Sequence, residues 1–207
     1  MMTITQIKVG VDNFSYLIQC EQTYQGALVD PGVDAAKAIQ FIAIRNLDLK
    51  YIILTHHHSD HTISTAQIQN TYPDAQIVAS KEEEKQMGFP IDQIVSDADI
   101  LQLGTVPLTI IHTPGHTPGG ICILVNKTAL LTGDTLFIGD CGRTDLPGGD
   151  VSQMFHSLHE KIMKLPDELI VYPGHDYGNK PFDTLGNQKR TNKILLESSL
   201  HKFSQIP

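Results

Sequence analysis

The stretch Thr55–His61, THHHSDH, places four of the ten histidines of the chain within six consecutive positions, directly after the apolar run YIIL at 51–54. Such a run predicts a buried strand. Because successive side chains of an extended segment point to opposite sides, His56 and His58 should project together and His57 should point away from them. The spacing therefore predicts that His56 and His58 bind one metal ion.

Asp60 and His61 come one turn later, where a helix should begin, so they project differently and are expected to bind a neighbouring metal. Three further stretches place a ligand-type residue after an apolar run and beside glycine: HTPGHTPGG, LLTGDTLF and VYPGHDYG. Glycine allows the sharp turns that such loops need, and the strand-end loops of a sandwich converge on one edge. Seven candidate ligands then gather there, as two groups of three and one bridging carboxylate: His56, His58 and His116; Asp60, His61 and His175; and Asp134.

A run of histidines alone is often only a surface feature, and an isolated histidine is more often structural than a ligand. Four such stretches together favour a metal site, because each follows an apolar run. A donor set made mostly of imidazole with carboxylate suits Zn, Fe or Mn better than Ca or Mg. We expect two divalent metal ions, with zinc as the first choice.

The composition predicts one domain spanning residues 1–207, since 207 residues with 41% hydrophobic content can bury a sizeable core. A formal charge of −8 argues against a nucleic-acid partner, because phosphate binding needs a basic surface. No apolar run approaches the roughly 18 residues of a membrane span, and the N-terminus lacks the pattern of a signal peptide. With three widely spaced cysteines, these features predict a cytoplasmic protein without a disulfide framework. They do not predict an oligomeric state.

Period-two or apolar runs predict strands at 3–9, 14–19, 27–29, 51–54, 76–79, 108–112, 121–125 and 170–172. Helical periods predict helices from Asp34 to Asn46, from near Asp60 to before Pro73, around 154–163 and from Asn187 to Phe203. Two strand-rich halves that also carry helices are typical of the α/β (α+β) class. We expect two sheets packed face to face and covered outside by helices.

The motif His-x-His-x-Asp-His resembles the signature of the metallo-β-lactamase superfamily, and the later stretches match its motifs in order. GDTLF and PGHDYG are similar to those of the glyoxalase II group and of the persulfide dioxygenases. The resemblance runs from DNFSYLI to QKRTN, nearly the whole chain. It implies a four-layer αββα sandwich with the metals at one edge.

This resemblance implies one of two reactions. A glyoxalase II-like enzyme would hydrolyse hydroxyacyl-glutathione or a similar thioester with a hydroxide that bridges two metals, and Asp60 and Asp134 would be its catalytic carboxylates. A persulfide dioxygenase would hold a single Fe(II) with His56, His116 and Asp134 and would oxidise glutathione persulfide. Because both reactions use the same positions, the motif does not decide between them, and we take the hydrolase as the first hypothesis.

The surrounding sequence is divided between the two groups. CGRTD and HSLHEKI resemble the dioxygenases, whereas DNFSYLI, THHHSDHT and GDTLF resemble glyoxalase II. The sequence ends soon after QKRTN, so the C-terminal helices with which longer glyoxalase II enzymes bind glutathione are not expected. Thr62-Ile63-Ser64 also replaces the usual Gly-Gly after the histidine motif, which affects the turn into the helix and not the ligands.

Two residues are candidates for binding a small-molecule substrate. Arg143 would meet an anionic group of the substrate or, as we favour, pair with Asp145 to hold its loop. Tyr177 would donate from its hydroxyl or act as a buried prop. Asp30, at the end of a predicted strand, should accept hydrogen bonds from the metal-site loop.

Overall fold

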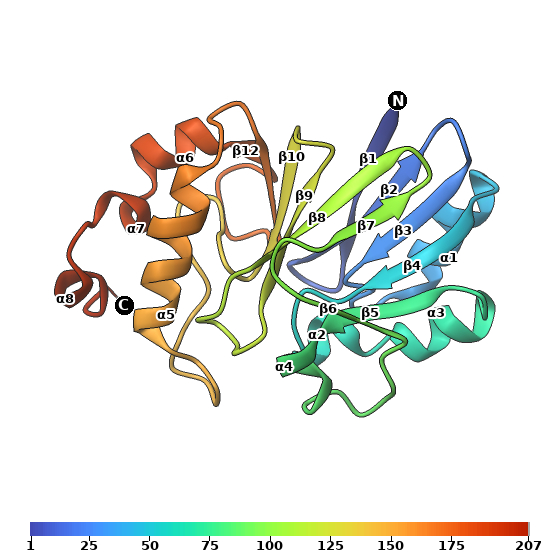
Figure 1. Cartoon of the computed structure of the whole chain (residues 1–207), viewed down its shortest axis with the longest axis horizontal. Coiled ribbons are helices and arrows are strands. Elements are labelled where there is room, and N and C mark those ends of the chain that lie inside the picture. Colours follow the sequence, from blue (N-terminus) through green and yellow to red (C-terminus); the bar gives the residue numbers. More distant parts are fainter. Residues whose placement is uncertain (207) are drawn as a thin grey trace.

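The first half of the chain forms one six-stranded sheet (Figure 1), and the computed structural model describes residues 1–206. The strands lie in chain order: β1 (Met2–Val9), β2 (Asn13–Cys20), β3 (Gln25–Val29), β4 (Asp48–Ile53), β5 (Gln76–Ser80) and β6 (Gln93–Val95). β1, β2 and β3 pair antiparallel, and β3 to β6 pair parallel. The carboxyl ends of the parallel strands therefore share one edge.

The second half forms another six-stranded sheet, ordered β12-β11-β10-β9-β8-β7. Its strands are β7 (Ile100–Leu103), β8 (Val106–His112), β9 (Ile121–Val125), β10 (Ala129–Gly133), β11 (Ile170–Pro173) and β12 (Asp183–Thr184). Only β10 and β11 pair parallel. Their carboxyl ends lie at the same edge of the molecule as the carboxyl end of β4. The hydrogen bond from Ile121 N to Thr55 O, which joins the two sheets at this edge, shows this.

Helices cover the outer face of each sheet, as Figure 1 shows. The first sheet carries α1 (Ala35–Ile44), α2 (Ser59–Thr62), α3 (Thr65–Thr71) and α4 (Lys81–Glu84). The second carries α5 (Val151–His156), which continues as π and 3₁₀ turns to Lys164, then α6 (Leu185–Thr191), α7 (Lys193–Leu196) and α8 (Leu200–Phe203). The predicted αββα arrangement is confirmed.

Three apolar clusters hold the four layers together. One lies between the sheets, one lies between the first sheet and its helices, and one lies between the second sheet and its helices. β2 contributes to two of these clusters. Ile18 packs in the cluster between the sheets, and its neighbour Leu17 packs in the cluster under the helices of the first sheet. A strand buried on both faces needs apolar residues at successive positions, so the middle of β2 reads as a nearly continuous run.

The prediction for the first helix is confirmed, because the Asp34 side chain accepts a hydrogen bond from Lys37 N at its start. The single helix expected from Asp60 is wrong, since a turn at Ile63 and Ser64 separates it into α2 and α3. Ser64 N donates to Gly32 O, which connects this turn to the loop after β3.

The single helix expected over 187–203 is also wrong, because it is three short helices. Asn192 ends α6 with an extended backbone, and its side chain accepts from Ile194 N and donates to the carbonyls of Phe137 and Asp140. An asparagine that binds backbone groups in this way competes with helix continuation. Four strands absent from the prediction are β6, β7, β10 and β12, three of which are four residues or shorter.

Within residues 1–206, no helix combines the length with the apolar character that crossing a membrane demands.

Replacing Ile110 by Ala should lower the free energy of unfolding by about 2–5 kcal/mol, because a buried side chain is lost and a cavity remains between the sheets. Ile44→Ala is the control, since Ile44 is 73% exposed and its loss should change stability by less than about 0.5 kcal/mol. Urea unfolding of both variants measures the difference. Equal losses would show that the contact between the sheets does not dominate stability.

Candidate metal centre

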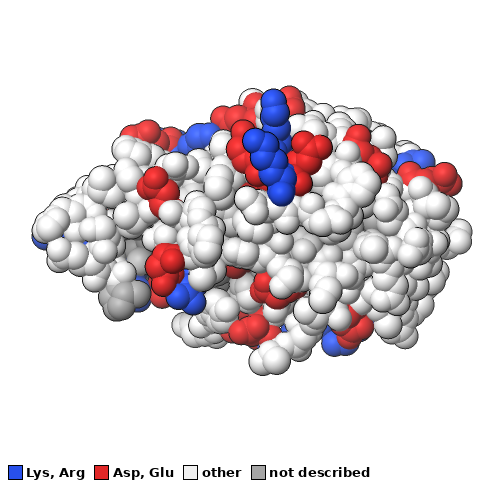
Figure 2. Space-filling view, turned by 90° about the horizontal axis from the view of Figure 1, so that it is seen from below, with Lys and Arg blue, Asp and Glu red and all other residues white. Residues whose placement is uncertain are grey.

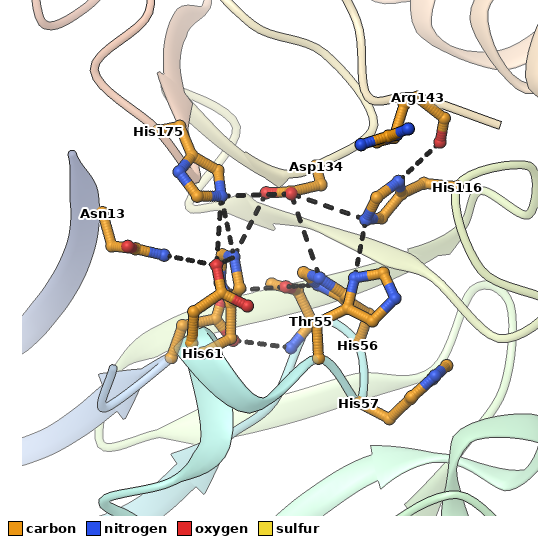
Figure 3. A network of polar contacts seen from close by, with 12 residues as sticks. Asn13, Thr55, His56, His57, His61, His116, Asp134, Arg143 and His175 are labelled. Atoms are coloured by element: carbon orange, nitrogen blue, oxygen red, sulfur yellow. Dashed lines mark hydrogen bonds and ion pairs between the residues drawn. The ribbon is translucent and has the colours of Figure 1, made fainter. Parts of the chain in front are cut away.

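Four loops bring the predicted ligands together at one edge of the sandwich, where β4, β8, β10 and β11 end (Figure 3). The ligand atoms of His56, His58 and His116 lie within 4.8 Å of one another. Those of Asp60, His61 and His175 also lie within 4.8 Å of one another. We call these sets the first and the second group.

Asp134 lies between the two groups. Its Oδ2 is 3.5 Å from His116 Nε2 and 4.0 Å from His56 Nε2, both in the first group. Oδ2 is also 3.2 Å from His175 Nε2, and Oδ1 is 3.4 Å from His61 Nε2, both in the second group. The structure thus places the carboxylate where a bridging ligand would lie.

The other ring nitrogen of three of these histidines is already engaged. His56 Nδ1 donates to Thr55 Oγ1 at 3.0 Å, His61 Nδ1 donates to Asp30 Oδ2 at 3.1 Å, and His116 Nδ1 donates to the carbonyl of Arg143 at 2.7 Å. In the neutral form of each ring, this bond fixes the tautomer and leaves a lone pair on Nε2. This is the usual arrangement of metal-binding histidines, which donate their second N–H to an oxygen.

Several buried polar atoms of the site make no hydrogen bond to the protein. Within residues 1–206, His56 Nε2, Asp134 Oδ1 and His175 Nδ1 make no hydrogen bond. Ring nitrogens also face each other closely, with His58 Nδ1 at 2.9 Å from His116 Nε2 and His61 Nε2 at 3.2 Å from His175 Nε2. Lone pairs gathered in this way fit divalent cations, and imidazole with carboxylate suits Zn, Fe or Mn.

Burial and charge set the ionisation of the site. Burial lowers the pKa of His58 to about 4 and also lowers the pKa of His56, so both rings are neutral at pH 7. Burial opposes charge on His61 as well, but Asp134 and Asp30 raise its pKa to about 9. Burial alone would raise the pKa of Asp134, yet His61 and the other nearby histidines lower it, so the carboxylate is ionised. Neutral rings and an ionised carboxylate are the forms that bind metals, so a cation at the second group would have to displace the proton of His61.

Asp30 holds both groups from outside. Its oxygens accept from Thr55 N at 2.8 Å, from Thr55 Oγ1 at 2.7 Å and from His61 Nδ1. Asp30 therefore orients His61 directly and His56 through the hydroxyl of Thr55. Asp30 also forms a third cluster of possible ligands with His56 and His61. Its oxygens are occupied by these hydrogen-bond donors, and the sequence predicts that Asp30 accepts hydrogen bonds from the metal-site loop.

The glycines beside the ligands allow close approach. Gly133 has a positive φ of 47°, and a Cβ atom there would lie 2.6 Å from Thr55 Oγ1. A Cβ atom on Gly174 would lie 2.3 Å from Asp134 Oδ1. A side chain at either position would push apart the loops that carry Thr55, Asp134 and His175.

A cleft of about 650 Å³ opens onto the two groups. Phe137, Ile138 and Tyr177 line it, as do Cys141 and Arg143. Tyr177 stacks on the His175 ring, with 4.7 Å between the ring centroids. The Arg143 guanidinium forms two hydrogen bonds with Asp145, at 2.6 and 2.7 Å, which is the pairing that we favoured.

The cations beside this cleft are paired with carboxylates. Lys180 lies 3.0 Å from Asp183, and Lys193 lies 3.2 Å from Asp140. Figure 2, which looks at the molecule from below relative to Figure 1, shows acidic and basic side chains intermixed on that face.

Two residues that contact the site, Asn13 and Glu83, were not predicted from the sequence. Asn13 Nδ2 donates to Asp60 Oδ2 at 2.8 Å, and Asn13 also pairs with His175 through the backbone. Its signal was present, because DNFSYLI is one of the stretches similar to glyoxalase II. Glu83 is fully buried and accepts from His57 N, although its stretch KEEEK has the composition of an exposed helix. His57 points away from Asp134 (Figure 3), as strand alternation predicts.

The sequence model of the Metallo-beta-lactamase superfamily matches residues 10–175. The chain belongs to this superfamily. Human "Persulfide dioxygenase ETHE1, mitochondrial" is 33% identical to it over 195 residues, which cover 93% of this chain and 75% of ETHE1. "Hydroxyacylglutathione hydrolase GloC" of Haemophilus influenzae is 35% identical over 192 residues, covering 84% of this chain and 88% of GloC.

Solved structures of the superfamily share this fold. The crystal structure of ETHE1 from Myxococcus xanthus superposes with a TM-score of 0.90 at 30% identity, over 99% of this chain and 89% of that one. TTHA1623, solved in a di-iron-bound form, superposes with a TM-score of 0.79 at 27% identity, over 92% of this chain and all of that one. Relatives named as a hydroxyacylglutathione hydrolase and as a persulfide dioxygenase are similar to this chain at comparable sequence identity, 35% and 33%.

Replacing Asp30 by Asn should weaken metal binding at both groups by about 10- to 100-fold, because the amide cannot accept from all three donors. The free energy of unfolding should fall by about 1–3 kcal/mol, since a buried donor loses its partner. Metal affinity is measured by competition with a chelator. Asp34→Asn, on the same loop, is the control, because asparagine caps a helix as well as aspartate does. Unchanged affinity in Asp30→Asn would contradict this role.

Proposed function

We propose that this superfamily member is a hydrolase that uses two divalent metal ions, preferably zinc, to cleave thioesters such as hydroxyacyl-glutathione. The metal ligands in this proposal are His56, His58 and His116 for the first ion, Asp60, His61 and His175 for the second, and Asp134 between them.

The completeness of the second group carries this proposal. A mononuclear iron enzyme needs only two histidines and one carboxylate, with open positions for its substrates. In this chain the second group has three ligand-type side chains within 4.8 Å, and each has its own support. Asn13 holds Asp60, Asp30 holds His61, and Tyr177 stacks on His175. A site supported in this way is suited to bind a second ion.

A bound divalent ion lowers the pKa of a coordinated water from 15.7 to about 7, which supplies a nucleophile at neutral pH. The side chains of this protein would position the reacting groups around such a water. The ionised Asp134 faces both groups, and within residues 1–206 its Oδ1 makes no hydrogen bond, although it lies 3.4 Å from His61 Nε2, so it could accept a hydrogen bond from a water bound there. Asp60, held by Asn13, would be the second carboxylate available to a water bound at the second group. Thioesters suit this geometry because a thiolate leaves readily.

Arg143 and Tyr177 are the proposed substrate-binding residues. Both line the cleft, the Arg143 side chain is 63% exposed and Tyr177 as a whole residue is 58% exposed, so a bound molecule can reach them. Arg143 would exchange part of its pairing with Asp145 for an anionic group of the thiol carrier. Its carbonyl would meanwhile keep its bond to His116, because the guanidinium moves independently of the backbone.

The second candidate is a persulfide dioxygenase with one Fe(II) on His56, His116 and Asp134. The 33% identity to human ETHE1 over 93% of this chain and the stretch CGRTD favour it. In that case the residues of the second group would serve as hydrogen-bonding partners around the iron.

Replacing His61 by Ala separates the two candidates. If the hydrolase proposal is correct, the variant loses the second ion, and thioester turnover falls by more than about 100-fold, as expected when charge stabilisation in the transition state is lost. Hydrolysis of hydroxyacyl-glutathione and oxygen uptake with glutathione persulfide are measured on the same preparations. His201→Ala, an exposed histidine on α8, is the control. Oxygen uptake that exceeds hydrolysis and survives in His61→Ala would contradict the proposal.

A further inference from the structure

Glu83 is a fully buried carboxylate in a helix whose other acidic residues, Glu82 and Glu84, are exposed. It lies in α4, directly after β5. Burying a carboxylate is costly unless hydrogen-bond donors surround it. The donors to Glu83 therefore indicate what its burial accomplishes.

The two oxygens of Glu83 bind two different loops of the metal centre. Oε2 accepts from the backbone N of His57 at 2.9 Å and also contacts His57 Nδ1. Oε1 accepts from Gly119 N at 2.7 Å. These donors lower the pKa of Glu83 against the effect of its burial, so the side chain is an ionised acceptor.

These loops carry the whole first group. His57 lies between His56 and His58, so fixing its N–H fixes the peptide that joins the two ligands. Gly119 lies three residues after His116 in the loop between β8 and β9. One carboxylate thus connects the segment with two ligands to the segment with the third.

The contact at Gly119 is close on both sides of its backbone. Ser80 Oγ donates to Gly119 O at 2.6 Å, while Gly119 N donates to Glu83. A Cβ atom at Gly119 would lie 2.3 Å from Ser80 Oγ and 2.8 Å from Glu83 Cγ. Only glycine therefore fits against the start of α4, and the loop is held at a fixed distance from it.

We propose that Glu83 is a positioning residue for the first metal group, which sets the approach of His58 to His116 by binding both of their loops. His58 Nδ1 and His116 Nε2 lie 2.9 Å apart, although 58 positions separate the two residues in the sequence. This inference rests on the metal ligands proposed above. It predicts a selective effect, because the second group is held by Asn13 and Asp30 and makes no use of Glu83.

The test is metal affinity at each group in Glu83→Gln. The amide keeps one oxygen for Gly119 but places an N–H₂ group against the donors of His57. Competition with a chelator gives the two dissociation constants for Zn²⁺. Anomalous scattering from crystals loaded with less than one equivalent assigns them to the groups. We expect affinity at the first group to weaken about 10- to 100-fold and affinity at the second to change by less than about 3-fold.

Glu84→Gln is the matched control, and both of its dissociation constants should equal those of the wild type. Ser80→Ala, which loosens Gly119 alone, should give a smaller loss in the same direction and serves if Glu83→Gln does not fold. A lower melting temperature with unchanged dissociation constants would overturn the inference, because Glu83 would then be only structural. Equal weakening at both groups would also overturn it. Wild-type protein that binds no ion at the first group would instead overturn the proposed metal ligands.

Discussion

The ionised carboxylate of Asp134, buried among ring nitrogens of four histidines, is the constraint on which the rest of the structure depends. It lies within 4.0 Å of His56, His61, His116 and His175, which come from three separate loops. Such a concentration of polar groups is unfavourable in a core unless every group has a partner. The fold meets this demand by ending parallel strands of both sheets at one edge and by supplying an outer set of acceptors. What remains at the centre is a set of lone pairs that face one another.

Three side chains outside the ligands hold this arrangement, and each acts on a different part. Asp30 orients one histidine in each group, Asn13 holds Asp60, and Glu83 joins the loops of the first group. All three bind backbone or ring N–H groups or an adjacent carboxylate, so they act through geometry. Precise geometry of this kind is what distinguishes a site able to hold metal ions from a cluster of histidines.

The sandwich and the gathering of the candidate ligands at one edge could be predicted from sequence because their signals are local. Each of these signals lies within a few residues of sequence. They are the stretch THHHSDH, the glycines directly before His116, Asp134 and His175, and the apolar runs that precede them. Glu83 could not be found in this way, because its burial depends on Gly119, which reaches it only in the folded chain. The prediction of one C-terminal helix was wrong for a similar reason, since Asn192 interrupts the helix by donating to the carbonyls of Phe137 and Asp140. β12 has two residues and pairs with the first two residues of β11, too short for a periodic pattern.

The number and kind of metal ions bound per chain tests the central claim most directly, because the two candidate reactions differ in the use of the second group. Elemental analysis of protein purified without added metal, followed by a crystal structure with anomalous scattering, gives both the stoichiometry and the positions. The account predicts two ions per chain, one at each group, with Asp134 between them. One iron per chain on His56, His116 and Asp134, with the second group empty at saturating metal, would contradict it.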